Sequence, residues 1–271
     1  MNTKRIGDID VAWTEQGDGE PVVLIHGLAE DRHTWAAQQS ALSGCRTYAY
    51  DLRGHGDSTV GTGRGEARQL AEDLIGFLEN VTGPAACVGF SLGGTIVLTA
   101  AAMRPELFRR AIVVGASSVV GRSAAEFYRM RISMIEHGVT DEFRAGLHED
   151  TAAALHNPSV DVAAVTARRL AAIGDGRGYV NAATAMARVN AEPLTETLPL
   201  IPIHVDVVGG EFDSFCPRKA SDLIMAGLRD ATFREIPNVG HLMNVDDPAA
   251  VTAMIESILS STPNPQPKEN P

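Results

Sequence analysis

Short apolar runs alternate along the chain with longer amphipathic stretches. The run "PVVLIHG" (21–27) is almost continuously apolar, as expected for a strand buried on both faces of a parallel sheet. The stretch 66–81 instead places Leu70, Leu74 and Leu78 on one face at helical spacing. The same two patterns predict further strands at 9–17, 46–51, 85–90, 111–116, 201–213 and 231–237, and further helices at 30–42, 92–103, 217–228 and 247–259. Strands that alternate with helices in this way predict βαβ units and a parallel sheet.

The alternation stops between about 118 and 197. This segment is rich in Ala and Arg, has no strand pattern, and predicts several helices, at roughly 122–137, 140–155, 160–173 and 179–190. We therefore expect an α/β core made of residues 1–117 and 198–260, interrupted by helices at 118–197. Residues 261–271 are so rich in proline and polar residues that we expect a disordered tail.

Composition narrows the classes of function. The chain has 271 residues and a formal net charge of −11, which argues against nucleic acid and an anionic membrane surface as partners. No apolar run approaches the ~20 residues that span a bilayer, and no signal-peptide pattern follows the first residues. Three widely spaced cysteines, Cys45, Cys87 and Cys216, predict neither a disulfide framework nor a zinc site, so a reducing cytoplasm is the expected location.

One serine, Ser91, interrupts the small and apolar run "CVGFSLGGTIVL". Gly89 and Gly93 flank it in the pattern G-x-S-x-G, between the predicted strand at 85–90 and the predicted helix at 92–103. Such a strand-to-helix turn lifts the hydroxyl above the end of the sheet, at the positive end of the helix dipole. Taken alone, the pattern fits a nucleophile and a helix-capping serine equally well.

Two later loops supply the partners that a nucleophilic serine needs, a base and a carboxylate that orients it. Asp213 follows the strand predicted at 201–213, and His241 follows the strand predicted at 231–237. A turn aspartate and a loop histidine are the structural alternatives, but three signals in the order serine, acid, histidine favour catalysis. Glu211 and Asp206 are weaker candidates for the acid, because one lies earlier in the loop and the other within the strand.

The chain resembles the α/β-hydrolase superfamily, in particular its small, cofactor-free bacterial branch of carboxylesterases, 3-oxoadipate enol-lactonases and non-haem haloperoxidases. The matching segments are "HGLAEDRHTW" (26–35), "DLRGHGDS" (51–58), "GFSLGG" (89–94), "GGEFDSFCP" (209–217) and "VGHLMNVDDP" (239–248). The similarity covers roughly residues 9–117 and 199–260. It implies an α/β-hydrolase fold, with a mostly parallel central sheet flanked by helices and with 118–197 as a helical cap over the site.

The resemblance also assigns roles to residues around Ser91. It implies an oxyanion hole made by the backbone N–H groups of Leu28 and Leu92, and it places Phe90, Leu242 and Met243 beside the substrate. No metal and no organic cofactor are implied. The segment "DLRGHG" offers an acid–base set in Asp51, Arg53 and His55, but the resemblance makes these three side chains structural. His26 is expected to brace its own loop.

The predicted function is hydrolysis of a small carboxylic ester or lactone through an acyl-enzyme on Ser91. Ser91 excludes the branches that use an aspartate nucleophile. A C–C bond hydrolase is a weaker alternative, because that branch usually has Asn and Trp where this chain has Phe90 and Leu242. A small-molecule receptor with little turnover is a second alternative, since some such receptors retain the same three residues.

The expected cap carries several side chains that could line the pocket. The pairs Arg129/Arg131 and Arg168/Arg169 could bind a substrate carboxylate, but solvated helix faces are the favoured interpretation. Apolar residues at helical spacing are more often plain core. This applies to Phe127, Tyr128, Met130, Met134, Phe143 and Met186.

Overall fold

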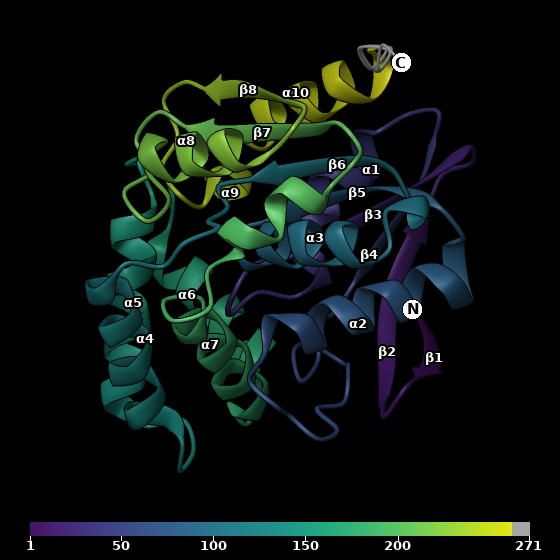
Figure 1. The fold of residues 1–271 in the computed structure, drawn as a ribbon. Coiled ribbons are helices and arrows are strands. Elements are labelled where there is room, and N and C mark those ends of the chain that lie inside the picture. The colour runs from purple at the N-terminus through teal and green to yellow at the C-terminus, as the bar shows by residue number, and fades with distance from the viewer. Residues whose placement is uncertain (262–271) are drawn as a thin grey trace.

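A computed structural model describes residues 1–261 of the chain. One sheet of eight strands runs through the molecule in the order β1-β2-β4-β3-β5-β6-β7-β8 (Figure 1). β1 pairs antiparallel with β2 and β2 with β4, whereas the remaining strands pair in parallel. The strands are β1 (Asn2–Ile6), β2 (Ile9–Gln16), β3 (Glu20–Ile25), β4 (Cys45–Tyr50), β5 (Ala85–Phe90), β6 (Phe108–Val114), β7 (Val205–Gly210) and β8 (Ala231–Ile236). The mostly parallel sheet predicted from the sequence is confirmed.

The first strand, β1, was not predicted. Four of its five residues are exposed and only Ile6 is buried. It lies at the edge of the sheet, where it has no apolar face that a hydrophobic pattern could reveal.

Helices cover both faces of the sheet. One face carries α2 (Ala67–Phe77), α3 (Leu92–Met103) and α8 (Arg218–Gly227), and the other carries α1 (Ala36–Ala41) and α10 (Pro248–Ser260). Strand β3 shows why both faces need cover: Val23 and Ile25 join one apolar cluster, while Leu24 joins the other. Successive side chains of a strand point to opposite faces, so a continuous apolar run demands apolar partners on both sides.

Four α-helices lie between β6 and β7 in the chain and gather at one end of the molecule, and two short 3-10 helices, Leu194–Glu196 and Leu198–Leu200, follow them (Figure 1). The four α-helices are α4 (Arg122–Ile135), α5 (Asp141–Ala154), α6 (Val162–Ile173) and α7 (Arg177–Arg188), and we call them the inserted helices. Their bounds fall within the helical segment predicted between 118 and 197.

The inserted helices contact the core through backbone groups on two sides. On one side Gly178, in α7, packs against Gly54 so closely that a Cβ atom on Gly178 would collide with the Gly54 carbonyl, and the Gly56 N–H donates to the Ala172 carbonyl at 2.8 Å. On the other side the Leu242 N–H donates to the Ala154 carbonyl at 3.0 Å. These contacts fix the inserted helices above the ends of the strands.

The predicted disordered tail, 261–271, lies outside the described residues except for Ser261. Arg110 donates to the Ser261 carbonyl at 2.7 Å and to its hydroxyl at 2.9 Å, and also pairs with the buried Asp206 at 3.0 Å. The end of α10 is therefore tied to β6 and β7. Within residues 1–261, none of the helices is both long and apolar enough to cross a membrane.

Candidate active site

Ser91 occupies a strained turn between β5 and α3. Its backbone has φ 52° and ψ −116°, in a region that residues with a side chain rarely adopt. The flanking glycines make this turn achievable: a Cβ atom on Gly89 would collide with the Gly93 carbonyl, and one on Gly93 with the Ile25 carbonyl. The G-x-S-x-G pattern is thus a steric requirement of the turn.

His241 lies next to the Ser91 hydroxyl, in the loop that follows β8. Its Nε2 atom is 3.0 Å from Ser91 Oγ, and its Nδ1 atom is 2.9 Å from Asp213 Oδ2. A carboxylate accepts only, so Nδ1 carries the proton and Nε2 is left to accept from the serine hydroxyl. The imidazole ring contacts the rings of Phe90 and Phe215, whose centroids are 5.1 and 5.3 Å away.

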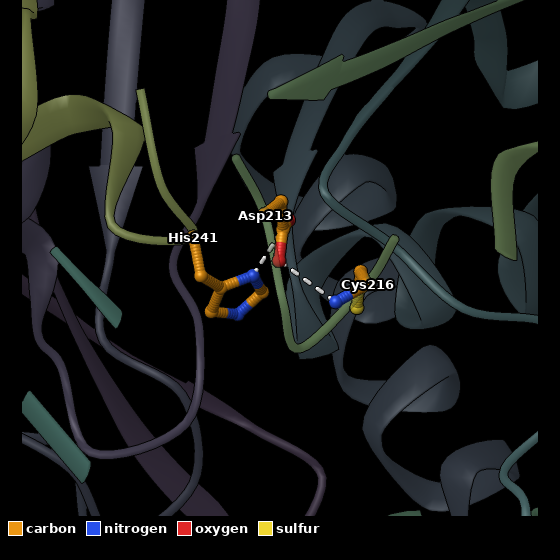
Figure 2. Close-up of side chains that lie close together, drawn as sticks. All are labelled: Asp213, Cys216 and His241. Atoms are coloured by element: carbon orange, nitrogen blue, oxygen red, sulfur yellow. Dashed lines mark hydrogen bonds and ion pairs between the residues drawn. The ribbon is translucent and has the colours of Figure 1, made fainter. Parts of the chain in front are cut away.

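Asp213 is fixed from both ends of its carboxylate. Figure 2 shows it between His241 and Cys216. Oδ2 faces His241, while Oδ1 accepts from the N–H groups of Phe215 at 2.9 Å and Cys216 at 2.8 Å. The weaker candidates are engaged elsewhere: Glu211 accepts from the Asn238 N–H, and Asp206 pairs with Arg110.

The loop that carries His241 is held by Asp246, at the end of α9 (Met243–Asp246), a residue that the sequence analysis did not single out. Its carboxylate accepts from the Gly240 N–H at 2.6 Å and from the N–H groups of His156 and Asn157, just after α5. One side chain therefore connects the inserted helices to the loop of the candidate base. Neighbouring Asp247 instead caps α10, the helix predicted at 247–259.

Leu28 and Leu92, the predicted oxyanion donors, lie on two adjoining turns. Leu92 is the first residue of α3, where backbone N–H groups have no acceptor within the helix. Leu28 lines the same pocket as Ser91. The loop before it is held by Glu30, which accepts from the Gly27 N–H at 3.0 Å and from the Thr34 hydroxyl at 2.9 Å.

His26 braces this loop, as expected from the sequence. The Leu52 N–H donates to its Nε2 atom at 2.9 Å, and its Nδ1 atom lies 2.8 Å from the Gly27 carbonyl. Burial lowers the pKa of His26 to about 4. The ring is therefore neutral and joins two loops below the site.

The residues of "DLRGHG" are engaged in structural contacts. Asp51 accepts from Arg32 and from the Asp57 N–H, and Arg53 pairs with Asp73 through two nitrogens. His55 is fully buried, and burial lowers its pKa to about 3. None of these contacts reaches Ser91 or His241, which supports the structural interpretation.

A cavity of about 60 Å³ lies over Ser91, between the core and the inserted helices. Its lining comprises Leu28, Phe90, Ser91, Phe127, Tyr128, Leu147, Asp150, Ala154, Arg169, Tyr179, Phe215, His241 and Leu242. Of the three residues predicted to lie beside the substrate, Phe90 and Leu242 line this cavity, and Met243 is buried in the core next to it without lining it.

Some side chains of the inserted helices line the cavity, although the sequence favoured a position in solvent or in the core for them. These are Phe127, Tyr128 and Arg169. Met130 is exposed and Phe143 is buried in a separate cluster.

Asp213, Cys216 and His241 also form a set of metal-ligand types, with ligand atoms within 4.8 Å of one another. Metal binding requires a thiolate and an unprotonated imidazole nitrogen. Burial raises the pKa of the Cys216 thiol to about 12, and the Nδ1 proton of His241 lies in its hydrogen bond to Asp213. The arrangement therefore favours hydrogen bonding over metal binding.

Comparison with known proteins places the chain in a family. The model of the alpha/beta hydrolase family matches residues 22–254. The chain belongs to this family. It is 26% identical over 263 residues to 3-oxoadipate enol-lactonase 2 of Acinetobacter baylyi, covering 93% of this chain and 92% of the relative. It is 27% identical over 261 residues to the pimeloyl-(acyl-carrier protein) methyl ester esterase of Serratia marcescens, covering 92% and 98%.

Solved structures agree with the family assignment. A thermophilic esterase from Thermogutta terrifontis, determined with malate bound, superposes with a TM-score of 0.82 at 26% identity and covers 96% of this chain and 98% of its own. The protein is therefore a member of a hydrolase family with esterase and lactonase relatives.

Proposed function

We propose that the protein hydrolyses a small carboxylic ester or lactone through an acyl-enzyme formed on Ser91. The observation that carries the proposal is the position of His241, within hydrogen-bond distance of Ser91 Oγ through one nitrogen and of Asp213 through the other. A hydroxyl is a poor nucleophile at neutral pH, and this arrangement supplies both the base and the group that orients it.

The reaction would follow from this geometry in two halves. Ser91 Oγ attacks the carbonyl carbon while His241 Nε2 takes its proton, and the carbonyl oxygen becomes negative. His241 then gives the proton to the leaving alkoxide oxygen as the ester bond breaks, which leaves an acyl group on Ser91. In the second half His241 takes a proton from water, the hydroxide attacks the acyl group, and the acid leaves as Ser91 regains its proton.

The developing oxyanion would be stabilised by the backbone N–H groups of Leu28 and Leu92. Such donors are effective because the fold holds them in place before the reaction starts. Here Glu30 and His26 hold the loop of Leu28, and the start of α3 holds Leu92. Main-chain donors make no demand on the side chain, so two leucines can serve.

We also propose that the inserted helices act as the cap of the pocket. The cavity over Ser91 is lined by core residues and by side chains from all four of these helices: Tyr128, Leu147, Arg169 and Tyr179. Such a cover excludes water and selects substrates by shape. The cytoplasm remains the proposed location, because the three cysteines are unpaired.

The first test is hydrolysis of p-nitrophenyl esters with acyl chains from C2 to C12, with and without a serine-reactive fluorophosphonate. We expect hydrolysis of the shorter esters, block of activity by the probe, and a fall in kcat of at least about 10⁴-fold in Ser91→Ala. Ser117→Ala is the matched control, since Ser117 also lies after a central strand but bonds to Cys216. Wild-type protein that is neither labelled nor active on esters or lactones would contradict the proposal and favour a receptor.

A further inference from the structure

A single guanidinium from the inserted helices reaches the cavity over Ser91. Arg169, in α6, lines this cavity, and it also lines a neighbouring cavity of about 320 Å³. Its Nη1 atom donates to the Thr151 hydroxyl at 2.8 Å, and its Nη2 atom approaches the Leu28 carbonyl at 3.4 Å. Its Nε atom is buried and has no hydrogen-bond partner among the described residues.

The carboxylates nearest to Arg169 are occupied by other donors. Both oxygens of Asp150 are bound by Arg131, at 2.7 and 2.8 Å. One oxygen of Glu30 accepts from the Gly27 N–H, and the other accepts from the Thr34 hydroxyl. Within residues 1–261, no carboxylate oxygen lies within 4.0 Å of the Arg169 guanidinium.

Asp150 is the carboxylate that also lines this cavity, and most of the remaining lining is apolar. Phe127, Leu147, Phe215 and Leu242 present apolar surface around Ser91. Burial lowers the pKa of Arg169 and the charge of Glu30 opposes that effect, but an arginine stays protonated in proteins. Glu30 and Asp150 thus act on Arg169 only from beyond ion-pair distance, and a partly buried cation without a direct ion pair can take one from a ligand.

We propose that Arg169 binds a carboxylate of the substrate, so that the preferred ester or lactone carries a free carboxylate in addition to the scissile group. This inference rests on the proposed chemistry at Ser91. With one N–H engaged on each of Nη1 and Nη2, the guanidinium keeps a second N–H on each of these nitrogens for the two oxygens of a carboxylate. The carboxylate end of the substrate then lies under α6 while the scissile carbonyl faces Ser91.

Arg169 has a second contact that the test must separate from this role. Its bond to the Leu28 carbonyl could also position the oxyanion loop. A positioning effect would weaken hydrolysis of every ester, whereas a carboxylate site affects only substrates that carry the charge.

The test compares esters that differ only in a terminal carboxylate or methyl group. These are the mono-p-nitrophenyl esters of succinate, glutarate and adipate against p-nitrophenyl butanoate, pentanoate and hexanoate. For at least one pair the wild type should prefer the charged ester in kcat/KM, by roughly 10- to 100-fold, as charge-assisted hydrogen bonds allow. Arg169→Met should abolish that preference, because kcat/KM of the charged ester falls much more than kcat/KM of the neutral ester.

Arg168→Met is the matched control. Arg168 is the adjacent arginine of α6, is exposed, and does not line the cavity over Ser91. It should keep the wild-type preference, and Arg169→Lys should keep part of it because it retains the charge. No preference of the wild type in any pair, or an equal loss of both esters in Arg169→Met, would overturn the proposal.

A binding measurement separates failure of this inference from failure of the proposed function. Succinate, glutarate and adipate are titrated into Ser91→Ala by calorimetry, which needs no turnover. At least one should bind, and the further replacement Arg169→Met should raise its Kd about tenfold or more. If the acids bind in an Arg169-dependent way but Ser91 of the wild type is not labelled by the fluorophosphonate, only the hydrolytic mechanism is wrong. If none of the three acids binds, the proposed carboxylate site is wrong.

Discussion

Asp213 uses its two carboxylate oxygens for different tasks. Oδ2 accepts a hydrogen bond from the Nδ1–H of His241, and Oδ1 accepts hydrogen bonds from two backbone N–H groups of its own loop. The second task holds the first oxygen in place, because the carboxylate cannot rotate without losing both N–H bonds. Orientation of the histidine therefore depends on a bonded loop as well as on a charge.

This division of tasks predicts the behaviour of Asp213→Asn. The amide oxygen can keep the bonds to Phe215 and Cys216, but the amide nitrogen then faces Nδ1 and favours the wrong tautomer of His241. We expect kcat for ester hydrolysis to fall by roughly 10³- to 10⁴-fold, with little change in the thermal midpoint.

Glu211→Gln is the control for that variant, since Glu211 lies in the same loop and bonds only to Asn238 among the described side-chain contacts. It should keep near-wild-type kcat. An Asp213→Asn protein with unchanged kcat would show that His241 is oriented by other groups.

Some residues of the candidate site could be predicted from the sequence, and others could not. Ser91, Asp213 and His241 could be predicted to lie together, because each follows a strand and the carboxyl ends of parallel strands meet at one edge. Arg169 could not be placed, since arginines on a helix usually face water and only the packing of α6 turns this one inward. The role of Asp246 could not be predicted for a similar reason: its donor His156 lies 90 residues earlier in the chain.

At the scale of elements, the loop of His241 and the end of α5 share one anchor. Asp246 accepts from Gly240 on one side and from His156 and Asn157 on the other. The Leu242 N–H adds a direct bond to the Ala154 carbonyl. The position of the candidate base is thus linked to the position of the inserted helices.

Asp246→Ala removes this anchor. Three backbone N–H groups lose their acceptor, so we expect kcat to fall by about 10-fold or more, because a small displacement of a catalytic group is costly. The rate of fluorophosphonate labelling of Ser91 should fall in parallel, since it needs the same base.

Asp247→Ala is the matched control, because Asp247 caps α10 and does not bond to the His241 loop. It should lower the thermal midpoint, as loss of a helix cap does, but leave kcat nearly unchanged. If Asp246→Ala and Asp247→Ala affected kcat alike, the anchor would have no specific role in catalysis.

For the whole molecule, buried histidines make stability depend on pH. His26 and His55 lie together below the site, fully buried, with ring centroids 5.4 Å apart. Burial lowers the pKa of His26 from 6.5 to about 4. Between these values the unfolded chain binds a proton that the folded chain does not, so stability is full above pH 6.5 and is lost as the pH falls towards 4.

His26→Gln tests this dependence. The lowered pKa corresponds to roughly 3 kcal/mol of stability lost by pH 4. The free energy of unfolding, measured in urea at pH 7.5 and 5.0, should therefore fall less in His26→Gln than in the wild type, by about 2 kcal/mol. His137→Gln, at a side chain 89% exposed, should show the wild-type difference. Equal differences in all three proteins would mean that His26 does not resist protonation.

The contact between Arg110 and Ser261 has a practical consequence. It fastens the end of α10 to the sheet, on the side of the molecule away from the inserted helices (Figure 1). A tether or reporter domain attached at this end would pull on a fastened helix, on the side of the molecule away from the inserted helices. The protein can thus be coupled to a solid support through this end with the inserted helices facing the liquid.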